Sequence, residues 1–411
     1  MGEGKLWNRN FILLWLGNAQ SAVGNTLYIV ALSYLILDLT GSPKYTAITM
    51  AAAALPYIFS PFAGAIVDRI NMKKYLVIGD FIRAGGMFFI CWLAFYNLLH
   101  VLLIIGTAFL LGIVGLIYRP SFAVLLPRLI PSSEIARANA LNSTTARIAS
   151  LLGFMFGGII VSWLGSIPAI LINGFSFFIM SFLLMIIDFP EIKHPHKTSD
   201  GVWLEVKEGF NYLLSTKLLL MIPIIFFIMN VSYSPLEILM PLKMQEMNEG
   251  AKGYGTFFAS LSIGAIVISA FISKFGKNLN TRSFTIIGLS VMAISMGGIA
   301  LSNNLLVACI FSSLFGAGSS LVGISNITYV QTEVDDKYRG RIFGVFGTIE
   351  QAGMPASLAL IGFLVDYVEA KSFLLFFAFL LALVGILWFI FNLGFRRQNQ
   401  KSHPTHEQQN F

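Results

Sequence analysis

The chain has 411 residues, of which 56% are hydrophobic and only 11% are charged, and its formal net charge is +7. An average globular protein carries about 25% charged residues, so this composition excludes a soluble protein that covers its surface with polar side chains. The lipid bilayer suits such a chain, because a helix that crosses a hydrocarbon core of about 30 Å needs about 20 mostly apolar residues.

Apolar runs bounded by charged or turn residues predict twelve membrane-spanning helices. Helices are expected because the alternating pattern of a barrel strand is absent and because open sheet edges are not tolerated in hydrocarbon. The predicted spans cover residues 11–37, 45–67, 76–96, 100–126, 139–163, 167–188, 218–241, 254–273, 284–302, 304–329, 342–365 and 372–394. The boundary at residues 302–304 is the weakest, since only Ser-Asn-Asn interrupts the apolar run there.

One long polar loop separates these spans into two sets of six, a layout typical of a duplicated transporter half. We therefore expect an all-α integral membrane protein with twelve transmembrane helices in two six-helix bundles. The expected parts are an N-terminal bundle over residues 1–188, a cytoplasmic central loop over 189–217, a C-terminal bundle over 218–395 and a disordered cytoplasmic tail over 396–411.

The basic residues of the loops predict the orientation. The side that holds both termini carries 20 lysines and arginines, and the opposite side carries four, which are Lys44, Lys243, Lys252 and Lys371. Cytoplasmic loops are enriched in these residues, so both termini and the central loop are expected in the cytoplasm. The same distribution accounts for the positive net charge without a nucleic-acid partner.

Polar side chains share one face of the first predicted span, where Asn18, Ser21 and Asn25 recur at helical spacing. Ser325, Asn326 and Tyr329 form a comparable edge in the tenth span. Together with the 37 phenylalanines of the chain, these positions predict a substrate cavity of aromatic walls with a few polar anchors. Such a cavity suits bulky amphiphiles.

A compact group of charges follows the second predicted span, in the stretch GAIVDRINMKK. Its lysines are accounted for by anchoring on the cytoplasmic side, but acidic residues contribute little to orientation. Asp68 stands at the membrane edge, where a carboxylate can meet the positive end of a neighbouring helix dipole. Conformational latching and plain anchoring are the two interpretations of this loop.

Four residues of this loop, Gly64, Asp68, Arg69 and Lys73, resemble the loop signature of the major facilitator superfamily. That signature is G-x-x-x-D-R followed by a basic residue four positions later, and it usually has glycine where Asn71 stands. The resemblance implies that the loop latches the cytoplasmic ends of the two halves, with the aspartate facing the start of the eleventh span.

Further stretches resemble the branch of this superfamily that contains drug and macrolide efflux proteins and siderophore exporters. They are residues 119–160, 171–178, 250–266 and 338–353. The resemblance implies the major facilitator fold, a multi-pass location in the bacterial cytoplasmic membrane, and transport of a small molecule.

The fifth predicted span carries closely spaced glycines at Gly153, Gly157 and Gly158. Small residues four positions apart let helices approach closely, so helix packing is expected here. The stretch also resembles the G-P-x-x-G-G motif of exporters, with Phe154 in place of the proline. The resemblance favours export over import.

Three arginines lie inside predicted spans, where ionisable residues are costly and usually functional. Arg83 follows Asp80 by three positions, which predicts an ion pair within one helix. Arg119 and Arg147 lie about two turns inside the cytoplasmic ends of their spans. For these two, snorkelling to the interface is one interpretation, and a role in the substrate cavity or in pairing between helices is the other.

Two acids are candidates for proton coupling. Glu350 lies about 14 Å into the eleventh span, because a helix rises about 1.5 Å per residue. A carboxyl group at that depth suits a proton carrier, since hydrocarbon disfavours its charged form. Glu237, in the seventh span on one face with Asn230 and Ser234, is the second candidate, with an outer gate as its alternative role.

The leading hypothesis is a monomeric exporter of hydrophobic or amphiphilic small molecules that is driven by proton antiport. Export of a siderophore or movement of a lysophospholipid is a second hypothesis, because arginines pair with carboxylates and phosphates. A membrane sensor that moves no substrate is a third. No enzyme, cofactor or metal site is expected: the phosphate-binding G-x-x-x-x-G-K-[ST] motif is absent, and His194 and His196 have no partner cluster.

Overall fold

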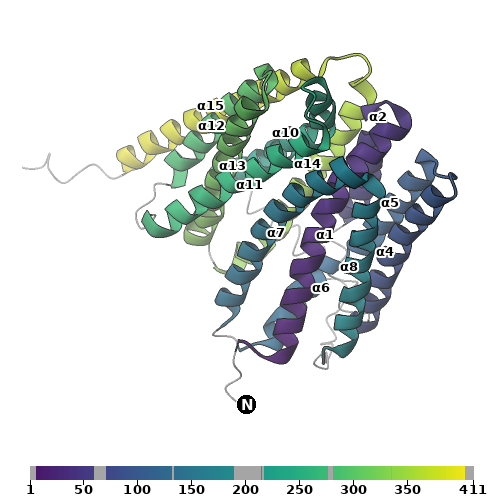
Figure 1. The fold of residues 1–411 in the computed structure, drawn as a ribbon. Helices are drawn as coiled ribbons and strands as arrows, with labels where there is room; N and C mark the ends of the chain where they lie inside the picture. Colours follow the sequence, from purple (N-terminus) through teal and green to yellow (C-terminus); the bar gives the residue numbers. More distant parts are fainter. Residues whose placement is uncertain are drawn as a thin grey trace, which may run out of the picture.

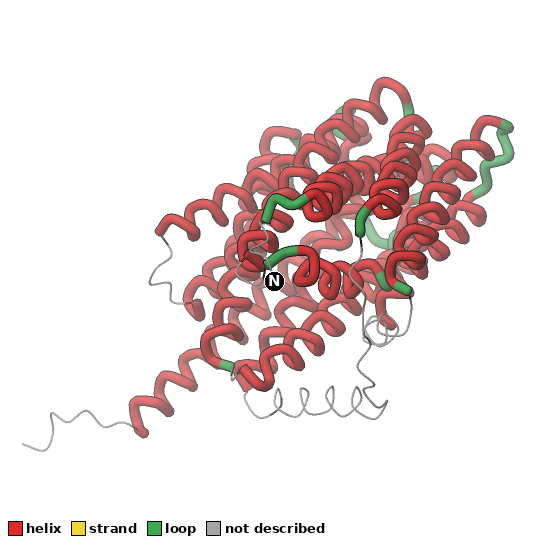
Figure 2. The backbone as a smooth tube through the Cα atoms, turned by 90° about the horizontal axis from the view of Figure 1, so that it is seen from below, coloured by secondary structure: helices red, strands yellow, loops and turns green. Residues whose placement is uncertain are grey.

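The computed structural model describes residues 6–59, 71–131, 134–188, 214, 217–275, 281–334 and 336–402. Every regular element among these residues is a helix, as the tube in Figure 2 shows. The N-terminal helices are α1 (Arg9–Thr40), α2 (Pro43–Ala54), the 3-10 helix η1 (Leu55–Phe59), α4 (Met72–Phe95), α5 (Val101–Gly115), α6 (Tyr118–Leu129), α7 (Ile135–Leu164) and α8 (Ser166–Ile186). The C-terminal helices are α10 (Lys217–Glu246), α11 (Gly250–Phe275), α12 (Thr281–Leu301), α13 (Leu305–Glu333), α14 (Asp336–Leu364) and α15 (Ala370–Ser402).

The positions of these helices agree with the all-α prediction. Each of the twelve predicted spans overlaps one or two of the helices described above. Nine helices of the described chain are long and apolar enough to cross a bilayer, and α5 and the second half of α14 are shorter apolar segments. The weakest predicted boundary is also present, since α12 ends at Leu301 and α13 begins at Leu305.

Two predicted spans are not single α-helices. In the second span, α2 ends at Ala54 and continues as the 3-10 helix, where Pro56 cannot donate a backbone hydrogen bond. Residues 60–70, at the end of this span and in the loop after it, lie outside the described residues. The fourth span is divided after Gly115, and Pro120 stands in the first turn of α6, a position that tolerates the missing N–H group.

Local sequence explains where several helices begin and end. The side-chain oxygen of Asn8 accepts a hydrogen bond from the Phe11 amide and caps the start of α1. Gly41, with φ of 67°, ends α1 in the left-handed conformation that favours glycine. Asn71 and Asn304 cap α4 and α13 in the same way as Asn8.

The last helix is longer than expected. α15 continues to Ser402, past residue 396, where the sequence predicts a disordered tail. Polar residues such as Arg and Gln are good helix formers, so the end of the apolar run does not stop the helix. The following Pro404 lies in residues 403–411, which are outside the described part of the chain.

The helices pack as two groups. In the N-terminal half, α1 packs on α7 and α8, and α4 packs on α5 and α8. In the C-terminal half, α13 packs on α11 and α12, and α10 packs on α14 and α15. Between the halves, the main contacts are α7 with α11 and α2 with α14. In Figure 1 the two groups converge near α2 and diverge away from it, toward the end of the molecule where α1 begins.

We call the end where the halves meet the closed end and define it by residues 33–48, 154–158, 251–258 and 362–366. Helices α7 and α11 touch there through glycines: a Cβ added to Gly158 would lie 2.7 Å from the Ala251 carbonyl oxygen. Aromatic rings fill the space beside this contact. Phe154 stacks on Phe258 with ring centroids 4.8 Å apart.

A charged contact lies at the rim of the closed end. The Lys44 Nζ atom of α2 is 3.5 Å from a carboxylate oxygen of Asp366, just after α14. The Ser42 hydroxyl donates a hydrogen bond to the same carboxylate at 3.5 Å. Both charged side chains are about two-fifths exposed (41% and 42%), so this pair contributes on the order of 0–1 kcal/mol.

Candidate functional site

A cavity of about 380 Å³ lies within the C-terminal half and is lined by α10, α11, α12 and α13, with one residue from α7. Its aromatic and apolar walls include Phe226, Met229, Leu261 and Phe315. The polar groups among its described lining residues include Asn230, Tyr233, Ser319, Ser320 and Arg147. This combination of apolar walls and few polar groups is typical of a small-molecule site.

Arg147 is the described lining residue that comes from the N-terminal half. Its Nη1 atom donates a hydrogen bond to the Ser320 hydroxyl of α13 at 3.1 Å. The Ser269 hydroxyl of α11 is 3.3 Å from the same serine oxygen. The guanidinium group therefore places a permanent positive charge at the junction of the two halves, beside the cavity.

Helix α10 contributes Asn230 and Tyr233 to the cavity wall. The Asn230 side-chain amide donates a hydrogen bond to the Phe226 carbonyl oxygen at 3.1 Å. Pro235 and Pro241 interrupt the hydrogen bonding of α10 beyond this point. The helix stays continuous, because prolines in a membrane helix are tolerated where neighbouring groups satisfy the freed carbonyls.

Glu237 lies on α10 between this cavity and the closed end. It is only 6% exposed, and it lies one helical turn along α10 from Tyr233, which lines the cavity. Tyr254 of α11 is fully buried, and its ring packs edge-on against Tyr34 of α1 with centroids 5.8 Å apart. The acid is therefore buried near the cavity-lining Tyr233 on its own helix.

A second buried charge group lies inside the N-terminal half. Asp80 is 1% exposed, and its carboxylate is 3.5 Å from the Arg83 Nη1 atom, which is the pair that the spacing predicts. The Arg83 guanidinium lies over the Tyr118 ring at 4.7 Å and the Phe177 ring at 4.3 Å. This pair joins α4 to α6 and α8.

Replacing Asp80 by alanine is expected to destabilise the protein by about 3–5 kcal/mol, because it leaves the Arg83 charge buried without its partner. The melting temperature in detergent measures this loss. Lys44→Ala is the matched control: it breaks the exposed pair with Asp366 and is expected to cost less than about 1 kcal/mol. Equal melting temperatures for the two variants would contradict a buried charge pair.

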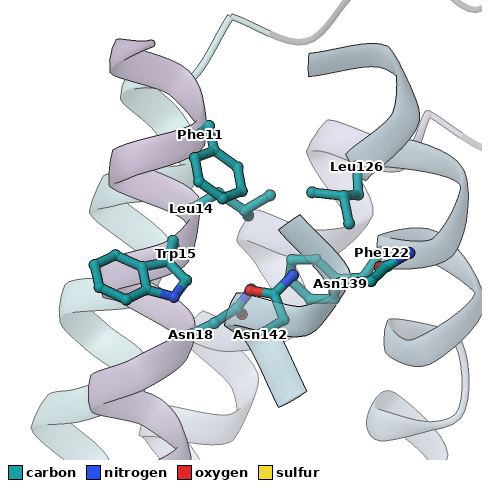
Figure 3. Close-up of a pocket in the computed structure, with 8 residues that line it drawn as sticks. All are labelled: Phe11, Leu14, Trp15, Asn18, Phe122, Leu126, Asn139 and Asn142. Atoms are coloured by element: carbon teal, nitrogen blue, oxygen red, sulfur yellow. The ribbon is translucent and has the colours of Figure 1, made fainter. Parts of the chain in front are cut away.

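A smaller pocket of about 150 Å³, which we call the inner pocket, lies between α1, α6 and α7 (Figure 3). Its described lining residues are Phe11, Leu14, Trp15, Asn18, Phe122, Leu126, Asn139 and Asn142. None of them lines the larger cavity. Asn18, which the sequence places in the substrate cavity, therefore belongs to a different pocket from Arg147 and Asn230.

The other predicted cavity residues lie elsewhere. Ser21 is buried and accepts a hydrogen bond from the Gln20 amide at 3.1 Å, and Asn25 is partly buried on α1. Asn326 is buried against α12, where the Thr285 hydroxyl donates to its side-chain oxygen at 3.0 Å. Tyr329 is buried, with the Arg282 guanidinium 5.4 Å from its ring centroid.

The predicted packing glycines contact two different helices. Gly153 and Gly157 face Thr26 and Val30 of α1, whereas Gly158 faces α11. The residues that sequence reasoning missed are Gly255 and Tyr254 of α11 and the two asparagines of α7 in the inner pocket. The glycines at 250, 253 and 255 were the available signal for the close approach of α11.

Several predicted residues cannot be placed in a site. Gly64, Asp68 and Arg69 of the predicted latch lie outside the described residues. Lys73, in the first turn of α4, donates a hydrogen bond to the Ile187 carbonyl oxygen at 2.8 Å. The backbones of Arg119 and Glu350 belong to α6 and α14, and their side chains lie outside the described part of the chain.

Comparison with known proteins identifies relatives along nearly the whole chain. A family model described as a transmembrane secretion effector, of the major facilitator type, matches residues 4–410. Macrolide efflux protein A of Streptococcus pyogenes is 22% identical and covers 93% of this chain and 95% of its own length. The multidrug efflux pump Tap of Mycolicibacterium fortuitum is 21% identical, with 92% and 94% covered.

A solved transporter structure has a similar fold to this chain. The crystal structure of the nucleoside transporter NupG superposes with a TM-score of 0.74 at 13% identity. The match covers 93% of this chain and 99% of that structure. At this identity the likeness concerns the fold alone.

Proposed function

The chain belongs to the transmembrane secretion effector family of the major facilitator superfamily, and on this premise we propose that it exports hydrophobic or amphiphilic small molecules of the macrolide or drug-like class. Transport is driven by proton antiport through alternating access, and the protein acts as a monomer. It lies in the bacterial cytoplasmic membrane with both termini in the cytoplasm.

The observation that carries this proposal is the buried Glu237, which lies one helical turn along α10 from the cavity-lining Tyr233. The cavity, of about 380 Å³, has the size and the apolar walls of a site for a drug-sized ligand. Cargo that packs against the Tyr233 ring changes the surroundings of the acid on the next turn of the helix. Binding of cargo and binding of a proton are thereby coupled at adjacent residues.

The proposed orientation in the membrane assigns the closed end to one side of the bilayer. With basic loops in the cytoplasm, the closed end, which holds Lys44 and Lys252, faces the outside. The halves therefore meet on the outer side and are ready to receive cargo from the inner side. Release requires that the α7–α11 and α2–α14 contacts separate, while the predicted latch loop holds the inner ends together.

Replacing Glu237 by glutamine is expected to reduce efflux to the level of cells that lack the protein. Glutamine keeps the size and polarity of the side chain but cannot exchange a proton. The measurement is the accumulation of a labelled macrolide in pump-deficient bacteria, with and without a protonophore. Glu249→Gln, at an exposed position before α11, is the matched control and is expected to export like the wild type.

Glu350→Gln forms the second arm of the same experiment. Loss of efflux with this variant alone would assign the proton to Glu350 and leave Glu237 an outer-gate residue. Efflux by the wild type that resists the protonophore would contradict proton antiport. Accumulation equal to that of empty cells would contradict macrolide export.

The position of Arg147 favours one alternative cargo. A guanidinium group beside the cavity, hydrogen-bonded to Ser320, can form a bidentate pair with a carboxylate or phosphate. A siderophore or a lysophospholipid carries such a group. Labelled forms of both in the same accumulation assay distinguish these cargoes from macrolides.

A further inference from the structure

The inner pocket contains polar side chains that make no hydrogen bond with the described part of the protein. Asn18 of α1 and Asn139 and Asn142 of α7 line it together. Among the described residues, none of these three carboxamides makes a hydrogen bond with the protein. Figure 3 shows Asn18 and Asn142 together toward one end of the pocket and Phe11 toward the other. Each carboxamide has two N–H donors and an acceptor oxygen, so the pocket offers unused donors and acceptors.

The walls around these carboxamides are held in place. The Trp15 indole Nε1 atom donates a hydrogen bond to the Thr145 hydroxyl at 3.0 Å, which ties α1 to α7 beside the pocket. Phe11 and Leu14 are buried on α1, and Leu126 is buried on α6. The pocket is therefore formed before a ligand arrives, so little ordering accompanies binding.

The lining defines the chemistry of a ligand. None of the eight described lining residues is ionisable, whereas apolar or aromatic walls surround the three carboxamides. A charged group has no described partner here, and an uncharged group with hydroxyl or carbonyl oxygens has several. The volume of about 150 Å³ is below the range of about 300–1,000 Å³ that holds a whole drug-sized molecule. It fits one ring of a larger molecule.

We propose that the inner pocket is a binding subsite that holds an uncharged, hydroxyl- or carbonyl-bearing ring of the cargo, such as a neutral sugar of a macrolide. This assignment rests on the proposed export function and adds a second contact point to it. The pocket lies near the starts of α1 and α7, which are the cytoplasmic ends in the proposed orientation. Cargo that enters from the cytoplasm meets it before the larger cavity.

The two sites lie along one helix. Arg147 follows Asn142 by five residues on α7, which is about 7.5 Å along the helix axis and about 140° around it. We expect a macrolide to contact both by lying across α7, with its neutral sugar in the inner pocket and its ring in the larger cavity. The subsite thus distinguishes cargo by a substituent that the larger cavity does not contact.

Protection of cysteines from alkylation tests the assignment in the full chain. Cys91→Ser and Cys309→Ser remove the native thiols, and Asn139→Cys or Asn230→Cys then introduces a reporter in the inner pocket or the larger cavity. The probes are a macrolide with a neutral sugar and the same macrolide without that sugar. We expect the complete macrolide to slow maleimide alkylation at both positions, and the truncated one to slow it only at position 230.

The outcomes separate the two proposals. Protection at position 230 but not at position 139 by the complete macrolide overturns the subsite and leaves export intact. Equal protection at position 139 by both macrolides also overturns it, because the sugar is then not the group that is held. Protection at neither position overturns both proposals for this class of cargo.

Variants at Asn142 supply a second measurement with the reporter at position 139. Asn142→Leu removes the hydrogen-bonding group and is expected to raise the half-protecting macrolide concentration about three- to tenfold. Asn142→Gln keeps the carboxamide and is expected to retain most of the affinity, which guards against a folding defect. Asn303→Leu, at an exposed position between α12 and α13, is the control. An unchanged half-protecting concentration for Asn142→Leu would overturn the proposal.

Discussion

Replacement of Gly255 by leucine is expected to abolish export while the chain stays folded in the membrane. A Cβ added to Gly255 meets the carbonyl oxygen of Phe154 and would lie 2.9 Å from the Cα atom of Gly158. These atoms are backbone, so no side-chain rotation can relieve the contact. Since α11 and α7 belong to different halves, the strain falls on the contact between the halves and leaves the packing within each half intact.

The consequence is a shift toward the state in which the closed end is open. Two measurements check it: accumulation of labelled macrolide in cells, and the distance between spin labels at Trp163 and Lys252, which are exposed near the ends of α7 and α11 that meet. We expect no efflux and a longer distance than in the wild type. Gly106→Leu is the control, because a Cβ there meets no atom within 4 Å. Normal efflux with an unchanged distance would refute this account of the closed end.

Replacement of Gly264 by leucine is expected to destabilise the C-terminal half strongly. A Cβ added to Gly264 meets the Ser313 carbonyl oxygen of α13, and a Cβ added to Gly316 meets the Leu261 carbonyl oxygen of α11. The two helices thus approach through reciprocal glycines, and both helices belong to the same half. Overpacking of a core typically costs about 1–3 kcal/mol and occasionally more. A clash with backbone atoms cannot be relieved by rotating a side chain, so we expect its cost in the upper part of this range.

Size-exclusion chromatography in detergent and the melting temperature measure this effect. We expect Gly264→Leu to give little monodisperse protein and a strongly lowered melting temperature. Gly297→Leu on α12, where an added Cβ meets no atom within 4 Å, is expected to behave like the wild type. Gly255→Leu is expected to remain monodisperse. Comparison of the two variants therefore distinguishes strain between the halves from loss of stability within one half. Indistinguishable melting temperatures at 264 and 297 would show that α11 and α13 can separate without cost.

Most of the fold could be predicted from the sequence, because the bilayer leaves a chain of this composition few choices. Backbone polar groups in hydrocarbon must be paired within the segment, so each long apolar run becomes a helix. Local residues then set the ends, as Asn8 and Gly41 do for α1 and Asn304 does for α13. The Asp80–Arg83 pair could also be predicted from the sequence, since a spacing of three residues brings two side chains onto the same face of any helix.

Only the tertiary structure decided which residues line the same site. Asn18 and Asn326 looked equivalent as polar residues on apolar helices, yet one lines the inner pocket and the other is bonded to Thr285 of α12. Arg147 and Asn230 line one cavity from different halves of the chain. A helix that is apolar nearly all round carries little pattern to define its rotation about its own axis, so packing against its neighbours decides which face meets a cavity.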